Sequence, residues 1–228
     1  MPYRTVLLDA DNTLFDFTRA ERATLIECLS VRGLPCDDHV VSRYAEINDA
    51  YWKRLERGDI TRERLKVERF ATLFAELGLV ADPVSISDDY LPTLATKAYL
   101  IDGAVDFCKR LRAAGCRLYL VTNGTAFVQH DRLAASPILS LLDDVFISEE
   151  IGASKPTRAY FDYVKTHIPD FDPTDTVVVG DSLSSDVQGG INAGLATCWY
   201  NPTHKTAPTD MPIDYICHSY EEILNIII

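Results

Sequence analysis

The sequence predicts an α/β fold in which a Rossmann-like parallel sheet is interrupted by an inserted, all-helical segment. Short apolar runs that end in polar residues recur along the chain, as buried parallel strands do, at residues 5–8, 118–121, 145–147 and 176–179. Between the first and second runs, residues 17–99 carry apolar residues at helical spacing and no convincing strand. We therefore expect a core domain of residues 1–16 and 100–228 and a helical domain of residues 17–99.

The first strand ends in two acidic residues, Asp9 and Asp11. Because side chains alternate along a strand, both carboxylates should point the same way. Two adjacent acids are unfavourable unless a cation or a proton joins them, and Mg²⁺ prefers carboxylate oxygens. One acid can then attack a phosphoryl group while the other transfers protons. The alternative is an ordinary aspartate-rich surface turn.

The inserted segment has the pattern of a small helical bundle. Apolar residues such as Leu25 and Leu29, and later Phe70 and Leu73, recur on single helical faces. The pattern stops at Gly78, a typical helix end. Residues 57–62 form a turn between two of these helices, with Asp59 or Thr61 as the expected N-cap.

The rest of the chain completes the core domain. Residues 104–113, stopped by Gly115, and residues 157–167 have the pattern of crossover helices. Residues 196–200 form a further expected strand, which gives at least five strands. The proline-rich run 201–212 is expected to be an exposed loop. Ser219 begins a capping-box sequence that predicts a short terminal helix packed on the sheet.

Polar residues also follow the later strands. In chain order they are Thr122 and Asn123, then Lys155, then Asp181 and Asp186. Ligands bind outside the carboxyl ends of the strands in open parallel sheets, so these residues should converge with Asp9 and Asp11. Each has a structural alternative: Lys155 as a solvated lysine, Thr122 as a turn cap, Asp181 in a structural ion pair and Asp186 as a charge at a helix N-terminus.

In type and order, this set resembles the four motifs of the haloacid dehalogenase superfamily of phosphohydrolases. The resemblance implies that Asp9 is a nucleophile that forms an aspartyl-phosphate, and that Asp11 is the general acid and base. It also implies a Mg²⁺ ion, with Mn²⁺ as an alternative, held by Asp9, Asp181 and the backbone carbonyl of Asp11. Thr122, Asn123 and Lys155 become candidates for substrate binding, and Asp186 becomes an orienting residue behind them.

The helical insert resembles the cap domain of one branch of this superfamily. Such caps close over the site and contact the substrate, which makes Arg62 a candidate for substrate binding, although it could equally be solvated. Residues 9–16, 55–61 and 182–190 are similar to those of bacterial noncanonical pyrimidine nucleotidases, which implies UMP, dUMP or dTMP as substrates. The alternatives are a sugar-phosphate or phosphoglycolate phosphatase, a phosphomutase and a catalytically silent scaffold. A true dehalogenase is disfavoured because a halide needs no proton from Asp11.

Composition narrows the expected partners. The formal net charge of −12 disfavours nucleic-acid polymers and anionic membranes, so the expected partner is a small phosphorylated metabolite. No apolar stretch approaches the roughly 20 residues that span a bilayer, and no segment resembles an export signal. The six cysteines are scattered without a Cys-x-x-Cys pair and are expected to be reduced core thiols. We therefore expect a cytoplasmic enzyme.

Overall fold

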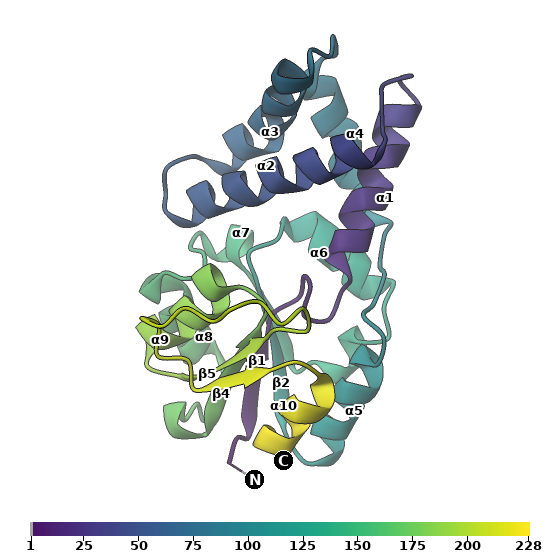
Figure 1. Ribbon diagram of the computed structural model, residues 1–228. Coiled ribbons are helices and arrows are strands. Elements are labelled where there is room, and N and C mark those ends of the chain that lie inside the picture. The colour runs from purple at the N-terminus through teal and green to yellow at the C-terminus, as the bar shows by residue number, and fades with distance from the viewer. Residues whose placement is uncertain (1) are drawn as a thin grey trace. The chain divides into compact units, whose positions relative to one another are not determined.

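The computed structural model describes residues 2–228, and its residues separate into two compact units. One unit comprises the residues up to Asp16 together with Leu100–Ile228, and the other comprises Phe17–Tyr99. The first unit is built on a six-stranded, all-parallel sheet (Figure 1). Its strands are β1 (Thr5–Leu8), β2 (Arg117–Thr122), β3 (Asp144–Ile147), β4 (Thr176–Gly180), β5 (Ala196–Tyr200) and β6 (Tyr215–Cys217). The predicted α/β fold with a parallel sheet is confirmed.

The strand order places β1 at the point where the chain changes direction across the sheet. The order is β3-β2-β1-β4-β5-β6, so β1 lies between β2 and β4. The chain leaves β1 toward β2 on one side and leaves β4 toward β5 on the other, so the loops that follow β1 and β4 diverge and leave room for a ligand. Strand β6, which we did not predict, is only three residues long and carries too little periodicity to be recognised.

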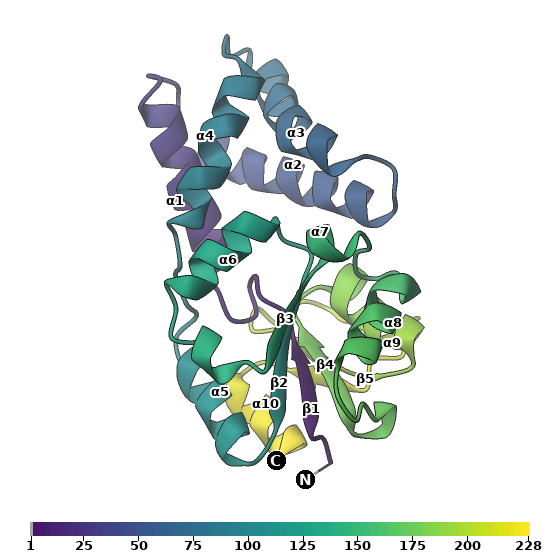
Figure 2. The ribbon, with the colours of Figure 1, turned by 180° about the vertical axis from the view of Figure 1, so that it is seen from behind.

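Within residues 2–228, six α-helices lie around this sheet. They are α5 (Ala104–Ala113), α6 (Ala126–Ala134), α7 (Ser148–Ile151), α8 (Arg158–His167), α9 (Gln188–Ala193) and α10 (Tyr220–Ile227). Figures 1 and 2 show α8 and α9 on one face of the sheet and α5 and α10 on the other. Because strand side chains alternate, Leu7, Tyr119 and Val121 share the face that packs against Tyr160 and Phe161 of α8.

The ends of the helices follow the signals in the sequence. Helix α5 spans the predicted residues and is followed by Gly115, whose φ of 89° few other residues adopt without strain. At α10, the Ser219 hydroxyl oxygen accepts a hydrogen bond of 3.2 Å from the Glu222 backbone N–H, as the capping-box spacing predicts. Tyr220 of this helix stacks on Phe107 of α5, with ring centroids 4.6 Å apart.

The second unit is all helical, with α1 (Phe17–Ser30), α2 (Asp38–Glu56), α3 (Arg62–Leu77) and α4 (Pro83–Ala95). Its core contains a buried polar chain as well as apolar side chains: Arg69 donates to Asn48 at 2.8 Å, and Asn48 donates to Glu21 at 2.6 Å. Thr61 caps α3, and the predicted stop at Gly78 has a left-handed backbone. The identification of this unit as a substrate-reading cap stays a prediction.

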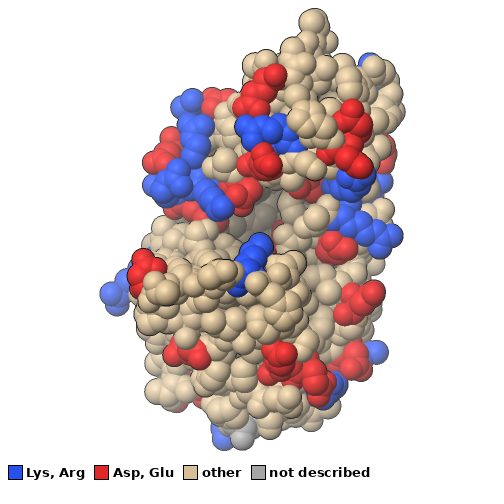
Figure 3. Space-filling model, viewed as in Figure 1, with Lys and Arg blue, Asp and Glu red and all other residues tan. Residues whose placement is uncertain are grey.

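The surface carries many charges of both signs. Acidic and basic side chains are interspersed on the face that Figure 3 shows. Exposed ion pairs join many of them, including Arg43 to Glu76 and Arg64 to Glu68, each at 2.6 Å. Such pairs contribute little stability individually. Among residues 2–228, no helix is both long enough and apolar enough to cross a bilayer. No disulfide joins any of the six cysteines, all of which lie within residues 2–228.

Candidate active site

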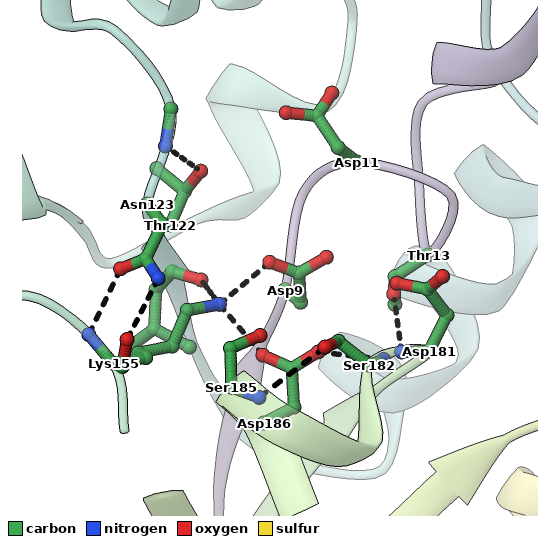
Figure 4. Close-up of polar contacts among 12 residues, drawn as sticks. Asp9, Asp11, Thr13, Thr122, Asn123, Lys155, Asp181, Ser182, Ser185 and Asp186 are labelled. Carbon is green, nitrogen blue, oxygen red and sulfur yellow. Dashed lines mark hydrogen bonds and ion pairs between the residues drawn. The ribbon is translucent and has the colours of Figure 1, made fainter. Parts of the chain in front are cut away.

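The carboxyl ends of four strands bring most of the predicted residues of the core domain together. Asp9 follows β1, Thr122 ends β2, and Asp181 follows β4. Lys155 enters from the loop that follows β3 and α7. Figure 4 shows their side chains grouped at this edge of the sheet. Residues more than 140 positions apart in the sequence therefore share one site, because parallel strands all end at the same edge.

A buried lysine links two of the carboxylates. Lys155 Nζ donates to Asp9 Oδ1 and to Asp186 Oδ1, both at 2.6 Å, and to the Val121 carbonyl oxygen at 2.8 Å. Its side chain is 1% exposed. Burying an ammonium ion this deeply is unfavourable unless its donors are satisfied, and here three acceptors satisfy them. Lys155 is therefore a fixed positive charge beside Asp9 rather than a solvated surface lysine.

Asn123 holds the backbone of Lys155 in place. Its Oδ1 accepts from the Lys155 backbone N–H at 2.9 Å, and its Nδ2 donates to the Lys155 carbonyl oxygen at 2.8 Å. This two-way contact joins the loop after β2 to the loop that carries Lys155. Asn123 thus has a visible structural task, and its predicted contact with substrate stays a prediction.

The backbone of Asp181 is held from two sides. Its N–H donates to the hydroxyl oxygen of Thr13 at 3.1 Å, and its carbonyl oxygen accepts from the indole N–H of Trp199 at 2.8 Å. Tyr220 in turn donates its hydroxyl proton to the Thr13 carbonyl oxygen at 2.6 Å. These contacts fix the point from which the Asp181 carboxylate projects toward Asp9.

Asp186 is buried behind the site in a π-helical turn, Leu183–Val187. Its Oδ2 accepts from the Ser182 backbone N–H at 3.0 Å, while its Oδ1 binds Lys155. Gly180 makes room for it, because a Cβ at that position would lie 2.2 Å from Asp186 Oδ2. The side chain is 1% exposed. Asp186 therefore forms an ion pair with Lys155. Its structural alternative, a charge at a helix N-terminus, does not account for this contact.

Asp11 points away from Asp9, as Figure 4 shows, so our prediction that the two carboxylates point the same way is wrong. Strand β1 ends at Leu8, and the alternation of side chains along a strand does not extend to Asp9 and Asp11. Asp11 lies in a tight turn in which Asn12 adopts the expected left-handed backbone, with a φ of 59°. The Asp11 carboxylate is bound by Gln129 and Arg132 of α6. It is therefore separate from the group formed by the other carboxylates.

Three carboxylates lie close enough together to hold a metal ion. Oxygens of Asp9, Asp181 and Asp186 lie within 4.8 Å of one another. We predicted Asp9 and Asp181 as ligands together with the backbone carbonyl of Asp11. Asp186 also lies in this group, and its two oxygens accept from Lys155 and from the Ser182 backbone N–H. When all three carboxylates are ionised, they and the Lys155 ammonium carry a net charge of −2, which a divalent cation would neutralise. An all-oxygen donor set of this charge fits Mg²⁺ or Mn²⁺.

Burial and like charges shift the acid–base behaviour of the site. Burial raises the pKa of Asp9 to about 7; the charge of Asp186 adds to this, and Lys155 opposes it. Burial and the charge of Asp9 also raise the pKa of Asp181 well above its usual range. Burial lowers the pKa of Lys155, but Asp186 and Asp9 outweigh that effect and leave it above its ordinary value. A cation beside the carboxylates would favour their ionised forms.

These shifts predict that the metal-free protein loses stability as the pH rises. Between about pH 4 and pH 7, the folded protein keeps a proton on Asp9 that the unfolded chain, with an ordinary pKa of about 3.9, has released. Folding is therefore favoured below this window, and the contribution, on the order of a few kcal/mol, is lost across it. Urea unfolding in EDTA at pH 5 and pH 8 measures the change.

Asp9→Asn is the comparison for this pH prediction, because asparagine does not ionise. From pH 5 to pH 8, the wild-type protein should lose stability relative to Asp9→Asn, and Mg²⁺ should restore it at pH 8. A difference between the two proteins that does not change with pH would contradict the raised pKa.

Several residues of the site were not predicted. Thr13 and Trp199 support Asp181, and Gln129 and Arg132 bind Asp11. Thr13 lies inside the first motif, so its position was a usable signal. The other three lie in segments whose local pattern gives no indication of a distant acidic partner. Gln129 and Arg132 belong to a polar run in α6 that reads as a solvated helix face.

The whole chain resembles proteins of known family. The sequence profile of the haloacid dehalogenase-like hydrolases matches residues 3–194. YfnB of Bacillus subtilis, named as a haloacid dehalogenase-type (HAD) hydrolase, is 36% identical over 99% of this chain and 95% of its own. Pyrimidine 5′-nucleotidase PynA of Streptococcus pneumoniae is 35% identical over the same shares of the two chains. Pyrimidine 5′-nucleotidase YjjG of Escherichia coli is 30% identical over 98% of this chain and 97% of its own.

A solved structure extends the similarity to three dimensions. The crystal structure of YfnB matches with a TM-score of 0.94 and covers 100% of this chain and 99% of that one. It is described as bound to magnesium and as revealing interdomain movement. The similarity therefore includes the sheet, the helical unit and the loops that carry the carboxylates.

Proposed function

Because the chain belongs to the haloacid dehalogenase-like hydrolases, we propose that it is a phosphatase that hydrolyses pyrimidine nucleoside 5′-monophosphates through an aspartyl-phosphate. The observation that carries the reaction is the Asp9 side chain, 9% exposed, with one carboxylate oxygen bonded to Lys155 and with Asp181 close by. A nucleophile beside a fixed positive charge can approach a phosphoryl group, which carries negative charge itself. The nucleotide is proposed from PynA and YjjG, both named pyrimidine 5′-nucleotidases.

The proposed reaction has two displacements at phosphorus. In the first, an oxygen of Asp9 bonds to phosphorus, the bond to the ester oxygen breaks, and Asp11 gives that leaving oxygen a proton. In the second, Asp11 takes a proton from water, the water oxygen bonds to phosphorus, and the aspartyl-phosphate bond breaks. Asp9 is regenerated and inorganic phosphate leaves. Thr122 and Lys155 bind the phosphoryl oxygens in both displacements.

We propose Mg²⁺ as the cofactor, with Mn²⁺ as a chemically similar substitute. Asp9 and Asp181, with the Asp11 backbone carbonyl, would hold the ion, and Asp186 would keep Lys155 and the nearby carboxylates in position. When bound, the ion supplies neutralising charge for the phosphoryl group. The support is the net charge of the acidic group and the magnesium bound in the YfnB structure.

A substrate panel tests this function. Phosphate release would be measured with nucleoside 5′-monophosphates, sugar phosphates and phosphoglycolate, each with Mg²⁺ and with EDTA. We expect metal-dependent release, fastest with UMP, dUMP or dTMP. A preference for sugar phosphates or phosphoglycolate would keep the chemistry and reject the nucleotide. No release from any substrate would reject the phosphatase proposal and favour a phosphomutase or a non-catalytic scaffold.

Arg62, the first residue of α3, is proposed to contact the nucleotide. Its guanidinium lies 5.7 Å from the centroid of the Trp52 ring, which restricts its direction. We expect Arg62→Ala to raise KM for UMP about tenfold, because the loss of one charge-assisted hydrogen bond has an effect of about this size. The KM for p-nitrophenyl phosphate should change much less. Arg64→Ala is the control, because Arg64 lies on the same helix and pairs with Glu68. Equal effects of Arg62→Ala on both substrates would contradict the proposal.

A further inference from the structure

Helix α6 presents two buried polar side chains to the site. Gln129 is 1% exposed and Arg132 is 0% exposed, although both residue types usually lie at the surface. Neither has a part in the two displacements described above. Polar groups this deeply buried require specific partners, and those partners identify what the helix does.

Both side chains bind the carboxylate of Asp11. Arg132 Nη1 donates to Asp11 Oδ1 at 2.6 Å, and Gln129 Nε2 donates to Asp11 Oδ2 at 2.8 Å. Each oxygen of the carboxylate therefore has its own donor, which fixes its position and its rotation. A carboxylate offers about four acceptor positions, so two remain for proton transfer.

Packing alone does not explain why Arg132 is buried. Its guanidinium lies 4.5 Å from the centroid of the Phe15 ring. Its Nε and Nη2 have no hydrogen-bond partner among residues 2–228. A buried cation with unsatisfied donors destabilises a fold relative to an apolar side chain of similar size. We therefore attribute the presence of an arginine at this position to its ion pair with Asp11.

Gln129 also sets the direction of the Thr122 hydroxyl. Thr122 Oγ1 accepts from Gln129 Nε2 and from the Gly124 backbone N–H, both at 3.0 Å. A hydroxyl has two acceptor positions and one proton, so with both positions filled its proton points elsewhere. Gly124 leaves the path of Gln129 open, because a Cβ there would lie 2.1 Å from Gln129 Nε2.

We infer that Gln129 and Arg132 are positioning residues for the phosphatase reaction. They fix the position and rotation of the Asp11 carboxylate, the group that transfers protons in the proposed reaction, and Gln129 directs the Thr122 proton toward the phosphoryl group. This inference rests on the proposed function, in which Asp11 is the proton-transfer group. Helix α6 therefore contributes to the site, in addition to the loops that follow the strands.

The test compares a leaving group that needs a proton with one that does not. The ribose oxygen of UMP must be protonated as it leaves, whereas p-nitrophenolate leaves readily without a proton. The variants are Arg132→Met, Arg132→Lys and Gln129→Met. Gln188→Met is the matched control, because the Gln188 side chain donates to exposed Asn192 at 2.8 Å. The quantity measured is kcat/KM, which reports the first displacement.

We expect Arg132→Met to lower kcat/KM for UMP about tenfold or more, which is part of the rate enhancement that proton transfer supplies. The value for p-nitrophenyl phosphate should fall less than about threefold. Arg132→Lys should recover part of the loss, because it keeps the positive charge. Gln129→Met should lower kcat/KM for both substrates, and more for UMP, since it also releases Thr122. Gln188→Met should match the wild-type enzyme.

The other outcomes separate the inference from the function beneath it. If the wild-type enzyme releases phosphate and the variants match it, or lose equally on both substrates, the inference is overturned and the phosphatase proposal survives. If the wild-type enzyme releases no phosphate from either substrate, the phosphatase proposal fails and the inference falls with it. Thermal unfolding identifies a variant that does not fold; if Arg132→Met is one, Arg132→Lys and Gln129→Met decide the result.

Discussion

Asp9→Asn is expected to lower the rate of phosphate release from every substrate by roughly 10⁴-fold or more, as is typical when a catalytic nucleophile is removed. The asparagine amide is a poor nucleophile and lacks the charge that Lys155 and a divalent cation attract. Fold and packing should be kept, because the two side chains have nearly the same shape. Phosphate release under saturating substrate, with the folded state checked by circular dichroism, measures the effect.

The control for Asp9→Asn is Asp106→Asn, which makes the same chemical change in the first turn of α5 at an exposed position. It should keep wild-type turnover. An Asp9→Asn protein with wild-type turnover would defeat the assignment of Asp9 as nucleophile. Loss of turnover in both variants would point to an effect of the amide substitution that does not depend on the site.

Lys155→Met is expected to destabilise the metal-free protein by about 3–5 kcal/mol, the typical result of removing one partner of a buried ion pair. The change leaves the carboxylates of Asp9 and Asp186 buried side by side without their shared cation. It also leaves the Val121 carbonyl oxygen without the donor at 2.8 Å. Urea unfolding in EDTA at pH 8, where these acids are ionised in the unfolded chain, measures the loss.

Two comparisons make the Lys155 prediction specific. Lys165→Met removes a lysine that donates to a carbonyl oxygen, that of Ala193 at 2.6 Å, and it should cost about 1 kcal/mol. Mg²⁺ should recover part of the loss in Lys155→Met, because a cation again lies between the carboxylates. If Lys155→Met is no less stable than Lys165→Met, the buried lysine does not balance the acidic site as we describe.

The family and the fold were accessible from the sequence because their signals are local. The strands that carry the motifs are short apolar runs, and each run ends in the polar residues that define a motif. The match of the family profile to residues 3–194 confirmed the resemblance drawn from those motifs. Helix α5 and the cap at Ser219 were also predicted where they occur, because a helix and its ends depend on residues only a few positions apart.

The contacts within the site were not accessible in the same way. Nothing near Arg132 in the sequence indicates an acidic partner 121 positions earlier, and its neighbours suggest an exposed helix face. Asn123 was predicted to bind substrate, yet its visible contacts clamp Lys155. Asp186 had a local interpretation as a helix-terminal charge, and only the fold revealed Lys155 as its partner.

The parallel sheet, the helical insert and the acidic residues near one edge of the sheet could all be predicted from the sequence. Periodicity, caps and strand-end motifs depend on neighbouring residues, so they can be read along the chain. The folded structure was needed to show that Lys155 bridges Asp9 and Asp186, and that α6 binds Asp11 through Gln129 and Arg132. Such pairs depend on how distant segments are brought together and on which charges become buried, and no local pattern records either.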